Sequence, residues 1–400
     1  MGWARFAVLL LCLAVAFVGG AAQETRSAGT MISEEISRRI AAALAAGGRE
    51  LLLQDMRLNE ISPELLREIA TRFPDLETLS LMGNEIQALP PEIGGLTRLK
   101  TLVLFDNRLT ALPPAIGALT ALEELSLDDN RLSALSAEIA GLRKLRKLSA
   151  DRNLLAALPQ DIGALGDLEK LSLTGNKLTE LPVRIGELGK LTSLELSGNQ
   201  LTALPPEIGA LEALTELRVG NNQLAVLPAE IGNLKNLRWL AIDKNRLTGV
   251  PATLARLTHL ETLALGEKPL TDIPPEIFAL KSLKHLFLHR AQLTRLPAEI
   301  AALSHLETLD LSVNQIGELP PELCRLNRLV LLNVSFNKLE TFPDCIGTAG
   351  QLRWSGERGV SRLQIEGNPL SALPGWIVKG GGNGVMDYFR VLKQRHPPPQ

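Results

Sequence analysis

An asparagine that recurs every 23 residues constrains the fold of this chain more than any other feature. From Asn84 to Asn337 the recurrence fails at only two positions, Lys268 and Ala291. Each asparagine lies in a frame of the form LxxLxLxxNxL, so the leucine spacing repeats with it. A fixed period of this length is typical of a solenoid, in which every repeat buries its apolar side against its neighbours.

The frame predicts a short strand followed by a turn. In LxL the leucines alternate with polar residues, so one side of the strand is buried and the other is exposed. The asparagine comes where the chain leaves the strand, and its amide can both donate and accept hydrogen bonds within its own and the neighbouring turn. We expect a buried ladder made of Asn84, Asn107, Asn130, Asn153, Asn176, Asn199, Asn222, Asn245, Asn314, Asn337 and Asn368.

The rest of each repeat predicts the opposite side of the solenoid. The segment from Leu89 to Leu99 has two prolines, which exclude a second sheet, followed by Ile93 and Leu96 at core positions. We therefore expect an irregular or 3-10 convex side.

These motifs resemble the leucine-rich repeat family in its 23-residue LPxxIxxLxxLxxLxLxxNxLxx form, over residues 49–376. The resemblance implies an α/β solenoid, a horseshoe of about 14 repeats with a concave parallel β-sheet and helical caps at both ends. The terminal segments are similar to those of bacterial and Roco-type repeat proteins. Residues 23–48 are expected to be a linker and an N-terminal capping helix that opens at Ser33, and residues 377–400 a C-terminal cap helix and tail. We also expect a helix over residues 63–72 and an eight-residue insertion over residues 355–362 that projects beside the concave face.

Residues 1–22 differ from the repeats and predict a secretory signal peptide. Arg5 precedes an unbroken apolar run from Ala7 to Val18, and small residues lead to a cleavage point after Ala22. The run is shorter than a membrane span, so no span is expected after cleavage. The protein is therefore expected to be secreted, periplasmic or at the cell surface; translation from Met31 is the cytoplasmic alternative.

Composition and charge narrow the possible functions. The formal net charge is −2 and becomes −3 without Arg5, so there is no basic stripe for nucleic acid. No catalytic, cofactor or metal constellation emerges, and four residues along one strand separate His285 from His289 by about 13 Å, too far for one zinc ion. The sequence predicts a non-enzymatic protein without a cofactor.

Two cysteines fall in adjacent repeats on the convex side. Cys324 and Cys345 are two positions out of register with each other. They form either a disulfide or two partly buried free thiols, and the offset in register favours the free thiols.

The variable strand positions are free to carry function, because the leucines and asparagines are committed to the core. Early strands carry mixed but acid-leaning residues, and the middle strands carry small polar ones. Later strands bring together aromatic, basic and acidic side chains, the usual anchors of a protein interface. This candidate patch consists of Arg218, Trp239, Asp243, His285, Phe287, His289, Arg290 and Asp310. The alternative is that Trp239 simply packs on its neighbours.

The leading hypothesis is a monomeric, non-enzymatic protein–protein interaction module or scaffold that binds its partner on the concave face. One alternative is a binder of glycan or another envelope polymer, in which Trp239 and Phe287 would stack on the ligand. The other alternative, an intracellular scaffold for a small GTPase or a phosphatase, follows from the family resemblance alone.

Overall fold

The computed structural model describes residues 22–270, 272–348 and 362–395. The chain divides into two compact units, Met1–Leu168 (unit 1) and Glu169–Gln400 (unit 2). The predicted signal peptide and the predicted insertion lie outside the described residues, apart from Ala22 and Arg362.

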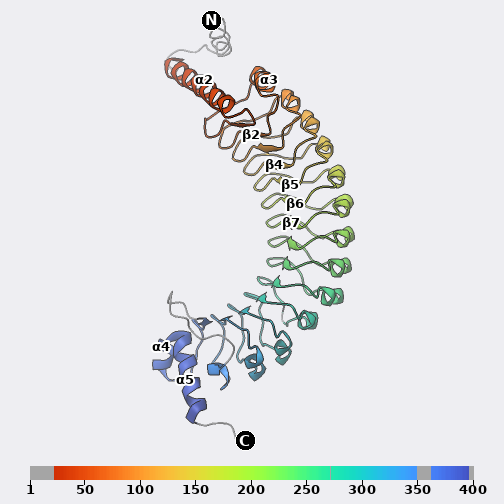
Figure 1. Cartoon of the computed structure of the whole chain (residues 1–400). Helices are drawn as coiled ribbons and strands as arrows, with labels where there is room; N and C mark the ends of the chain where they lie inside the picture. The colour runs from red at the N-terminus through yellow and green to blue at the C-terminus, as the bar shows by residue number, and fades with distance from the viewer. Residues whose placement is uncertain (1–21, 271, 349–361, 396–400) are drawn as a thin grey trace, which may run out of the picture. The chain divides into compact units, whose positions relative to one another are not determined.

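In each unit, short parallel strands follow one another in chain order, and 3-10 segments lie on the opposite side of the core (Figure 1). Unit 1 has the strands β1 (Glu50–Leu52), β2 (Thr78–Ser80), β3 (Thr101–Val103), β4 (Glu124–Ser126) and β5 (Lys147–Ser149). Unit 2 has the strands β6 (Lys170–Ser172), β7 (Ser193–Glu195), β8 (Glu216–Arg218), β9 (Trp239–Ala241), β10 (Thr262–Ala264), β11 (His285–Phe287), β12 (Thr308–Asp310), β13 (Leu331–Asn333) and β14 (Leu363–Gln364). The predicted solenoid of about 14 repeats is confirmed, with fourteen strands in the described part of the chain.

The core is a column of leucines in register. The middle leucine of one strand pairs with that of the next, as Leu79 does with Leu102 and Leu240 with Leu263. These four side chains are fully buried, and each contributes about 2 kcal/mol by leaving water. Because the leucines point inward, their strand neighbours form an outer surface, which we call the strand face.

The 3-10 segments are as regular as the strands. A residue with extended backbone precedes each of η1 to η8, η10 and η11; before η1 this residue is Pro90, with φ −71° and ψ 155°. Ile93 in η1 is fully buried against the leucine core. The segments are η1 (Pro91–Gly95), η2 (Pro114–Ala118), η3 (Ala137–Gly141), η4 (Gln160–Ala164), η5 (Val183–Glu187), η6 (Pro206–Ala210), η7 (Ala229–Asn233), η8 (Ala252–Arg256), η9 (Pro275–Ala279), η10 (Ala298–Ala302), η11 (Pro321–Arg325) and η12 (Ile346–Thr348).

The asparagine amides tie consecutive turns together. The Nδ2 group of Asn107 donates to the carbonyl oxygens of Leu81 (2.9 Å) and Leu104 (3.2 Å), and its Oδ1 accepts the Ile86 N–H (3.1 Å). Within unit 2, Asn222 makes the equivalent bonds to its own and the preceding repeat. One side chain thus satisfies three backbone groups that would otherwise be buried without partners.

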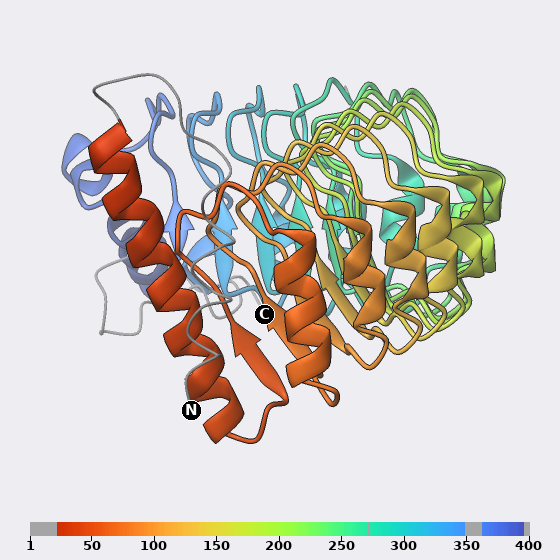
Figure 2. The same ribbon diagram turned by 90° about the horizontal axis from the view of Figure 1, so that it is seen from above.

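Helices cover the sheet edge in both units. In unit 1, α2 (Ala22–Ala45) packs on β1, and α3 (Pro63–Arg72) occupies the bounds expected for it (Figure 2). Arg39 of α2 donates to the carbonyl oxygens of Leu52 (3.1 Å) and Gln54 (3.0 Å) beside that strand. In unit 2, α4 (Gly375–Lys379) leads to α5 (Gly381–Arg395), which contacts η12 and β14.

The expected start of the N-terminal helix was wrong. The helix α2 begins at Ala22 rather than at Ser33, so the segment expected as a linker is helical. This segment has no proline, and its alanine, glutamate and arginine residues favour a helix, so the helix continues through Gly29.

Candidate functional site

Arg218 and Trp239 open the candidate patch on the strand face of unit 2. The Cζ atom of Arg218 lies 4.6 Å from the ring centroid of Trp239, a cation–π contact. Glu216, two residues before Arg218 on β8, forms an ion pair with it. Trp239 remains 41% exposed, so it packs on its neighbour and also presents an apolar surface to solvent.

Short side chains separate the large ones of this patch. Thr262 on β10 pairs with Trp239 on one side and with His285 on the other, and in the next row Ala264 pairs with Phe287. Thr262 is 95% buried although it belongs to the strand face, because it lies between larger neighbours. The strand β10 is therefore a low strip between the larger side chains of β9 and β11.

Two glycines that sequence reasoning missed make room for charged members of the patch. A Cβ atom at Gly220 would lie 2.9 Å from Oδ1 of Asp243. A Cβ atom at Gly266 would lie 2.4 Å from the carbonyl oxygen and 3.0 Å from Nδ1 of His289. The available signal was a glycine at a strand-end position where other repeats carry a side chain.

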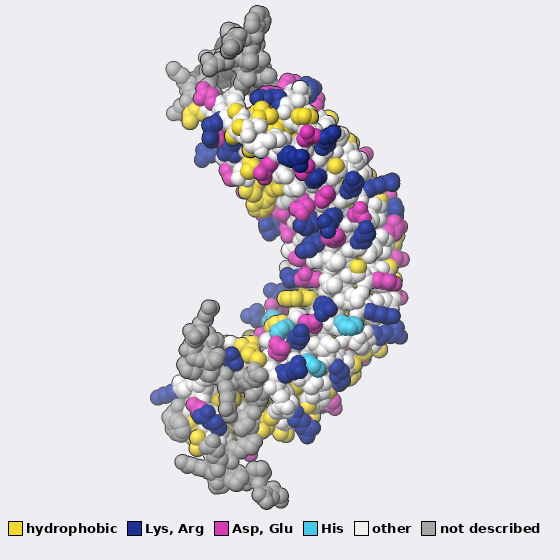
Figure 3. Space-filling model, in the orientation of Figure 1, with side chains coloured by type: hydrophobic (Ala, Val, Ile, Leu, Met, Phe, Trp, Pro, Cys, Tyr) yellow, Lys and Arg dark blue, Asp and Glu magenta, His cyan; other side chains and the backbone are white. Residues whose placement is uncertain are grey.

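A row of charged side chains, linked by ion pairs, crosses the strand ends of β9 to β11. Oε1 of Glu267 lies 3.2 Å from Nζ of Lys244 and 3.2 Å from Nε2 of His289. Burial tends to raise the pKa of Glu267, but the contacts with His289 and Lys244 outweigh it and hold that pKa below its ordinary value. Unit 2 shows histidines among basic and acidic side chains in the space-filling view (Figure 3).

Lys268, at the first gap in the asparagine ladder, is almost completely buried. Its Nζ has no hydrogen-bond partner among the described residues. Desolvation lowers the pKa of Lys268 from 10.5 to about 7, and the charge of Asp243 opposes this only in part. In other repeats the carbonyl oxygen equivalent to that of Leu265 accepts hydrogen bonds from two asparagine amides, as that of Leu104 does. Among the described residues, no amide donates to the carbonyl oxygen of Leu265.

At the second gap, where Ala291 stands, the hydrogen bonds of the missing asparagine are taken over by the Ala291 backbone and by Asn314 of the next repeat. The Leu270 N–H donates to the carbonyl oxygen of Ala291 (3.0 Å), and the Ala291 N–H donates to Oδ1 of Asn314 (2.9 Å). The turn is therefore satisfied differently from the turns that hold an asparagine.

The remaining members of the patch differ in availability. Oδ1 of Asp310 accepts the Ser312 N–H (2.9 Å), so part of this carboxylate holds its own turn. Arg290 is exposed and has no ion pair with any described residue. His285 and Phe287 are half-buried on β11.

Unsatisfied polar atoms gather in the same part of unit 2. In the described ranges, the buried side-chain nitrogens without a hydrogen-bond partner are Nε of Arg218, Nζ of Lys268 and Nδ1 of His289. Buried polar groups are normally paired, so an unpaired group is a reason to look for a function.

The acid-leaning strands of unit 1 are largely neutralised from within. Arg152 forms two hydrogen bonds with Asp129 (2.5 Å each), which lower the pKa of that carboxyl. Lys147 pairs with Glu124 (2.5 Å), and Asp128 accepts the Asp151 N–H (2.7 Å). Few of these charges are left for a partner, in contrast to Arg290 in unit 2.

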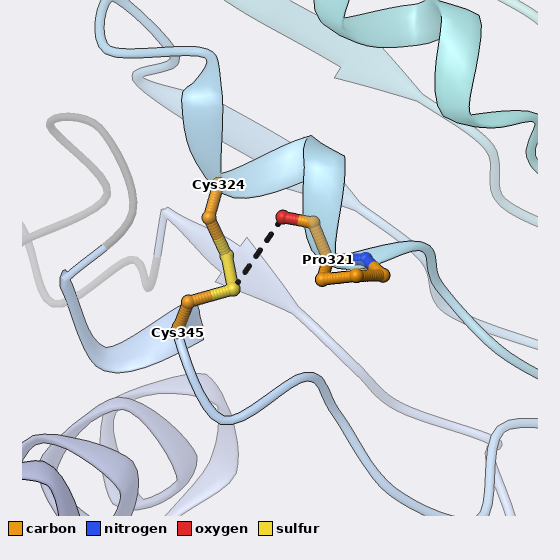
Figure 4. The surroundings of a disulfide bond; sticks show 3 residues. All are labelled: Pro321, Cys324 and Cys345. Atoms are coloured by element: carbon orange, nitrogen blue, oxygen red, sulfur yellow. Dashed lines mark hydrogen bonds between the residues drawn. A yellow bond between two sulfur atoms is a disulfide. The ribbon is translucent and has the colours of Figure 1, made fainter. Parts of the chain in front are cut away.

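Cys324 and Cys345 form a disulfide, so the expectation of two free thiols was wrong (Figure 4). Their Cα atoms are 6.0 Å apart, within the range that a disulfide spans. The offset in register is absorbed because the chain after Pro343 forms a turn and the short η12 instead of a full-length 3-10 segment. Sγ of Cys345 also lies 3.5 Å from the carbonyl oxygen of Pro321.

Two classes of site find no support in the described part of the chain. No helix there is long and apolar enough to cross a membrane. No group of three or more His, Cys, Asp or Glu side chains is arranged to hold a metal ion.

The comparisons with known proteins identify the family. The model described as "Leucine-rich repeat region" matches residues 44–154, 138–222, 186–271 and 275–354. The structure of the leucine-rich repeat protein LIC12759 of Leptospira interrogans is similar to this chain, with 32% identity, coverage of 82% of this chain and 93% of that one, and a TM-score of 0.69. The chain belongs to the leucine-rich repeat family, whose members typically bind proteins and are not enzymes.

Two further solved structures show how widely the fold is shared. An internalin, inlF of Listeria monocytogenes, has 24% identity over 78% of this chain and 88% of its own, with a TM-score of 0.67. The plant peptide hormone receptor RGFR1, solved in complex with RGF2, has 29% identity over 80% of this chain, with a TM-score of 0.53. This chain spans 59% of the receptor chain's length. No curated protein sequence matches the chain.

Proposed function

We propose that this protein is a non-enzymatic interaction module, a monomer that binds a protein partner on the strand face of unit 2. The observation that carries the proposal is the exposed Trp239, stacked by Arg218 and set beside the low strip of β10. Tryptophan and arginine are the residues most often found at the energetic centre of protein interfaces. Phe287 supplies a second apolar side chain across the strip.

The relatives support a protein partner over other ligands. RGFR1 and PEPR1, which are similar to this chain, were each solved in complex with a peptide partner, RGF2 and AtPEP1. The candidate patch has the polar and aromatic mixture of a peptide-binding or protein-binding surface.

We also propose that the protein is exported and loses residues 1–22 as a signal peptide. The disulfide between Cys324 and Cys345 supports export, because disulfides persist mainly in oxidising compartments. N-terminal sequencing of the protein from its source tests this: Met1 or Met31 at the N-terminus of a cytosolic form would contradict export and favour the intracellular scaffold.

Affinity capture from the native source tests the binding proposal. The double variant Trp239→Ala, Phe287→Ser is compared with the wild-type protein, and Phe105→Ser on unit 1 is the matched control. Circular dichroism must show all three to be folded. We expect one partner to be captured by the wild type and the control but lost from the double variant.

Equal capture by all three proteins would refute this location of the site. Retention of the wild-type protein on envelope material from which protein has been removed, and its loss in the double variant, would replace the protein partner with a glycan or another envelope polymer.

A further inference from the structure

The residue before each ladder asparagine has a left-handed backbone, which suits glycine. Glycine stands there at four repeats, among them Gly175 with φ 71° and Gly198 with φ 70°. Val313 and Phe336 occupy the same position with φ 56° and 55°. A β-branched or bulky residue is rare in this region because its Cβ approaches the backbone too closely.

Burial does not explain these two residues. Val313 is 41% exposed and Phe336 is 60% exposed. The ring of Phe336 fits beside Gly367 only because glycine has no side chain: a Cβ atom at Gly367 would lie 2.5 Å from Cδ1 of the Phe336 ring. Strained and exposed apolar residues lower both stability and solubility, so their presence needs another reason.

Val313, Phe336 and Arg290 lie in three consecutive turns, which we call the turn row. The Arg290 N–H donates to the carbonyl oxygen of Ser312 (2.9 Å), next to Val313 in the chain. The Val313 N–H donates to the carbonyl oxygen of Ser335 (2.8 Å), next to Phe336. The backbone therefore holds the three residues side by side.

Arg290 gives the turn row its charge. In equivalent positions of other turns, Arg152 pairs with Asp129 and Lys244 pairs with Glu267. Arg290 is exposed and has no ion pair among the residues that the structure describes. An unpaired guanidinium beside apolar side chains complements a carboxylate beside an apolar group.

We infer that the turn row binds a partner segment in which an apolar side chain lies next to a carboxylate. The inference rests on the proposed function and extends it, because Arg290 is shared by the candidate patch and the turn row. Val313 and Phe336 receive the apolar side chain, and Arg290 pairs with the carboxylate. Strain held at an exposed site is then retained for binding rather than for folding.

The test uses twelve-residue synthetic peptides with a central Leu-Phe pair flanked by Asp, by Ser or by Lys. Their binding is measured by fluorescence anisotropy on the full-length protein and on Val313→Gly and Arg290→Gln. We expect the Asp-flanked peptide to bind best and each variant to weaken it by about tenfold, the effect of a residue at an interface hot spot. Binding that is equal for Asp-flanked and Lys-flanked peptides, absent for all peptides, or unchanged in the variants would overturn the inference.

A stability measurement separates this role from a structural one. Val226 is 64% exposed and lacks a left-handed backbone, so Val226→Gly is the matched control. Val313→Gly should keep its unfolding midpoint, because relief of strain offsets the freedom that glycine gains in the unfolded chain, while Val226→Gly should lower its midpoint and bind the peptide normally. Equal loss of stability in both variants would show that Val313 is not strained.

The double variant Trp239→Ala, Phe287→Ser distinguishes the two proposals. It should still bind the Asp-flanked peptide, since both substitutions lie outside the turn row. Failure of the peptide test therefore leaves the capture result standing, and failure of the capture test leaves the peptide result standing.

Discussion

Replacing Lys268 with asparagine should stabilise this protein. The wild-type protein buries an amine without a hydrogen-bond partner where the repeat otherwise places an asparagine. In other turns the asparagine Oδ1 accepts a backbone N–H from the preceding repeat, and here that donor, Leu247, has no acceptor in the described part of the chain. Lys268→Asn removes the buried amine and supplies the missing acceptor.

The magnitude follows from the pKa of the lysine. Burial lowers the pKa of Lys268 from 10.5 to about 7, a difference that corresponds to about 5 kcal/mol when the amine is protonated in the unfolded chain. Asparagine buries three fewer methylene groups, which costs about 2 kcal/mol. Each restored hydrogen bond returns about 1 kcal/mol. With one restored hydrogen bond, to the Leu247 N–H, we expect a net gain in the free energy of unfolding of about 4 kcal/mol at pH 7.

The sign of the pH dependence is fixed by the direction of the shift. Below about pH 7 the amine is protonated in both states, and the folded state carries the whole penalty. As the pH rises from 7 toward 10.5 the folded protein holds fewer protons than the unfolded chain, so the wild type gains stability; between pH 7 and 9 the gain is about 2 kcal/mol. A variant without the amine lacks this gain.

Urea unfolding at pH 7 and pH 9, followed by circular dichroism, measures both effects. Lys268→Met is the matched variant, because it keeps the apolar stem and removes only the amine. Both variants should lack the gain in the free energy of unfolding between pH 7 and pH 9. Only Lys268→Asn should slow hydrogen exchange at the Leu247 amide. A wild type and Lys268→Met that gain equally between pH 7 and 9 would refute the buried, neutralised lysine.

Three further substitutions probe the frame of the repeats. Asn199→Ala leaves backbone groups of two turns unsatisfied and should lower the free energy of unfolding by about 1–3 kcal/mol; an unchanged urea midpoint would contradict the ladder. Gly266→Ala places a Cβ atom 2.4 Å from a backbone oxygen of the next turn and should cost about 2 kcal/mol, whereas Gly249→Ala, with open space around it, should cost nothing. Cys324→Ser removes a disulfide whose cysteines are 21 residues apart and should lower the free energy of unfolding by about 3 kcal/mol. Reductant should lower the stability of the wild type by a similar amount and leave that of the variant unchanged.

The regular part of this fold was readable from the sequence because the period repeats the same physical problem. Each LxL must bury its leucines, and each asparagine must satisfy the same turn, so one correct register predicts every strand. The helix α3 was also predictable, since Ser62 caps it and Pro63 begins it. None of these predictions needed a contact between distant segments.

The features that sequence reasoning missed depend on where side chains end. The sequence shows Lys268 at an asparagine position, but a long lysine stem can reach solvent from a buried backbone, and only the structure shows that Nζ stays inside. The disulfide was judged from a two-residue offset, whereas its formation depends on the turn that precedes Cys345. The strain at Val313 was not predicted, because the residue type at a variable position does not show that the backbone φ there is positive.

The residues that depart from the repeat pattern are clustered, and this clustering is itself an argument about function. The unpaired nitrogens of Arg218, Lys268 and His289 lie between β8 and β11, and the strained Val313 and Phe336 follow β12 and β13. A solenoid tolerates local cost of this kind because neighbouring repeats hold each turn in place. Selection for stability alone would place asparagine at position 268 and glycine at positions 313 and 336, the residues that other repeats carry there. Their concentration beside an exposed tryptophan is what a binding surface built into a regular frame would leave behind.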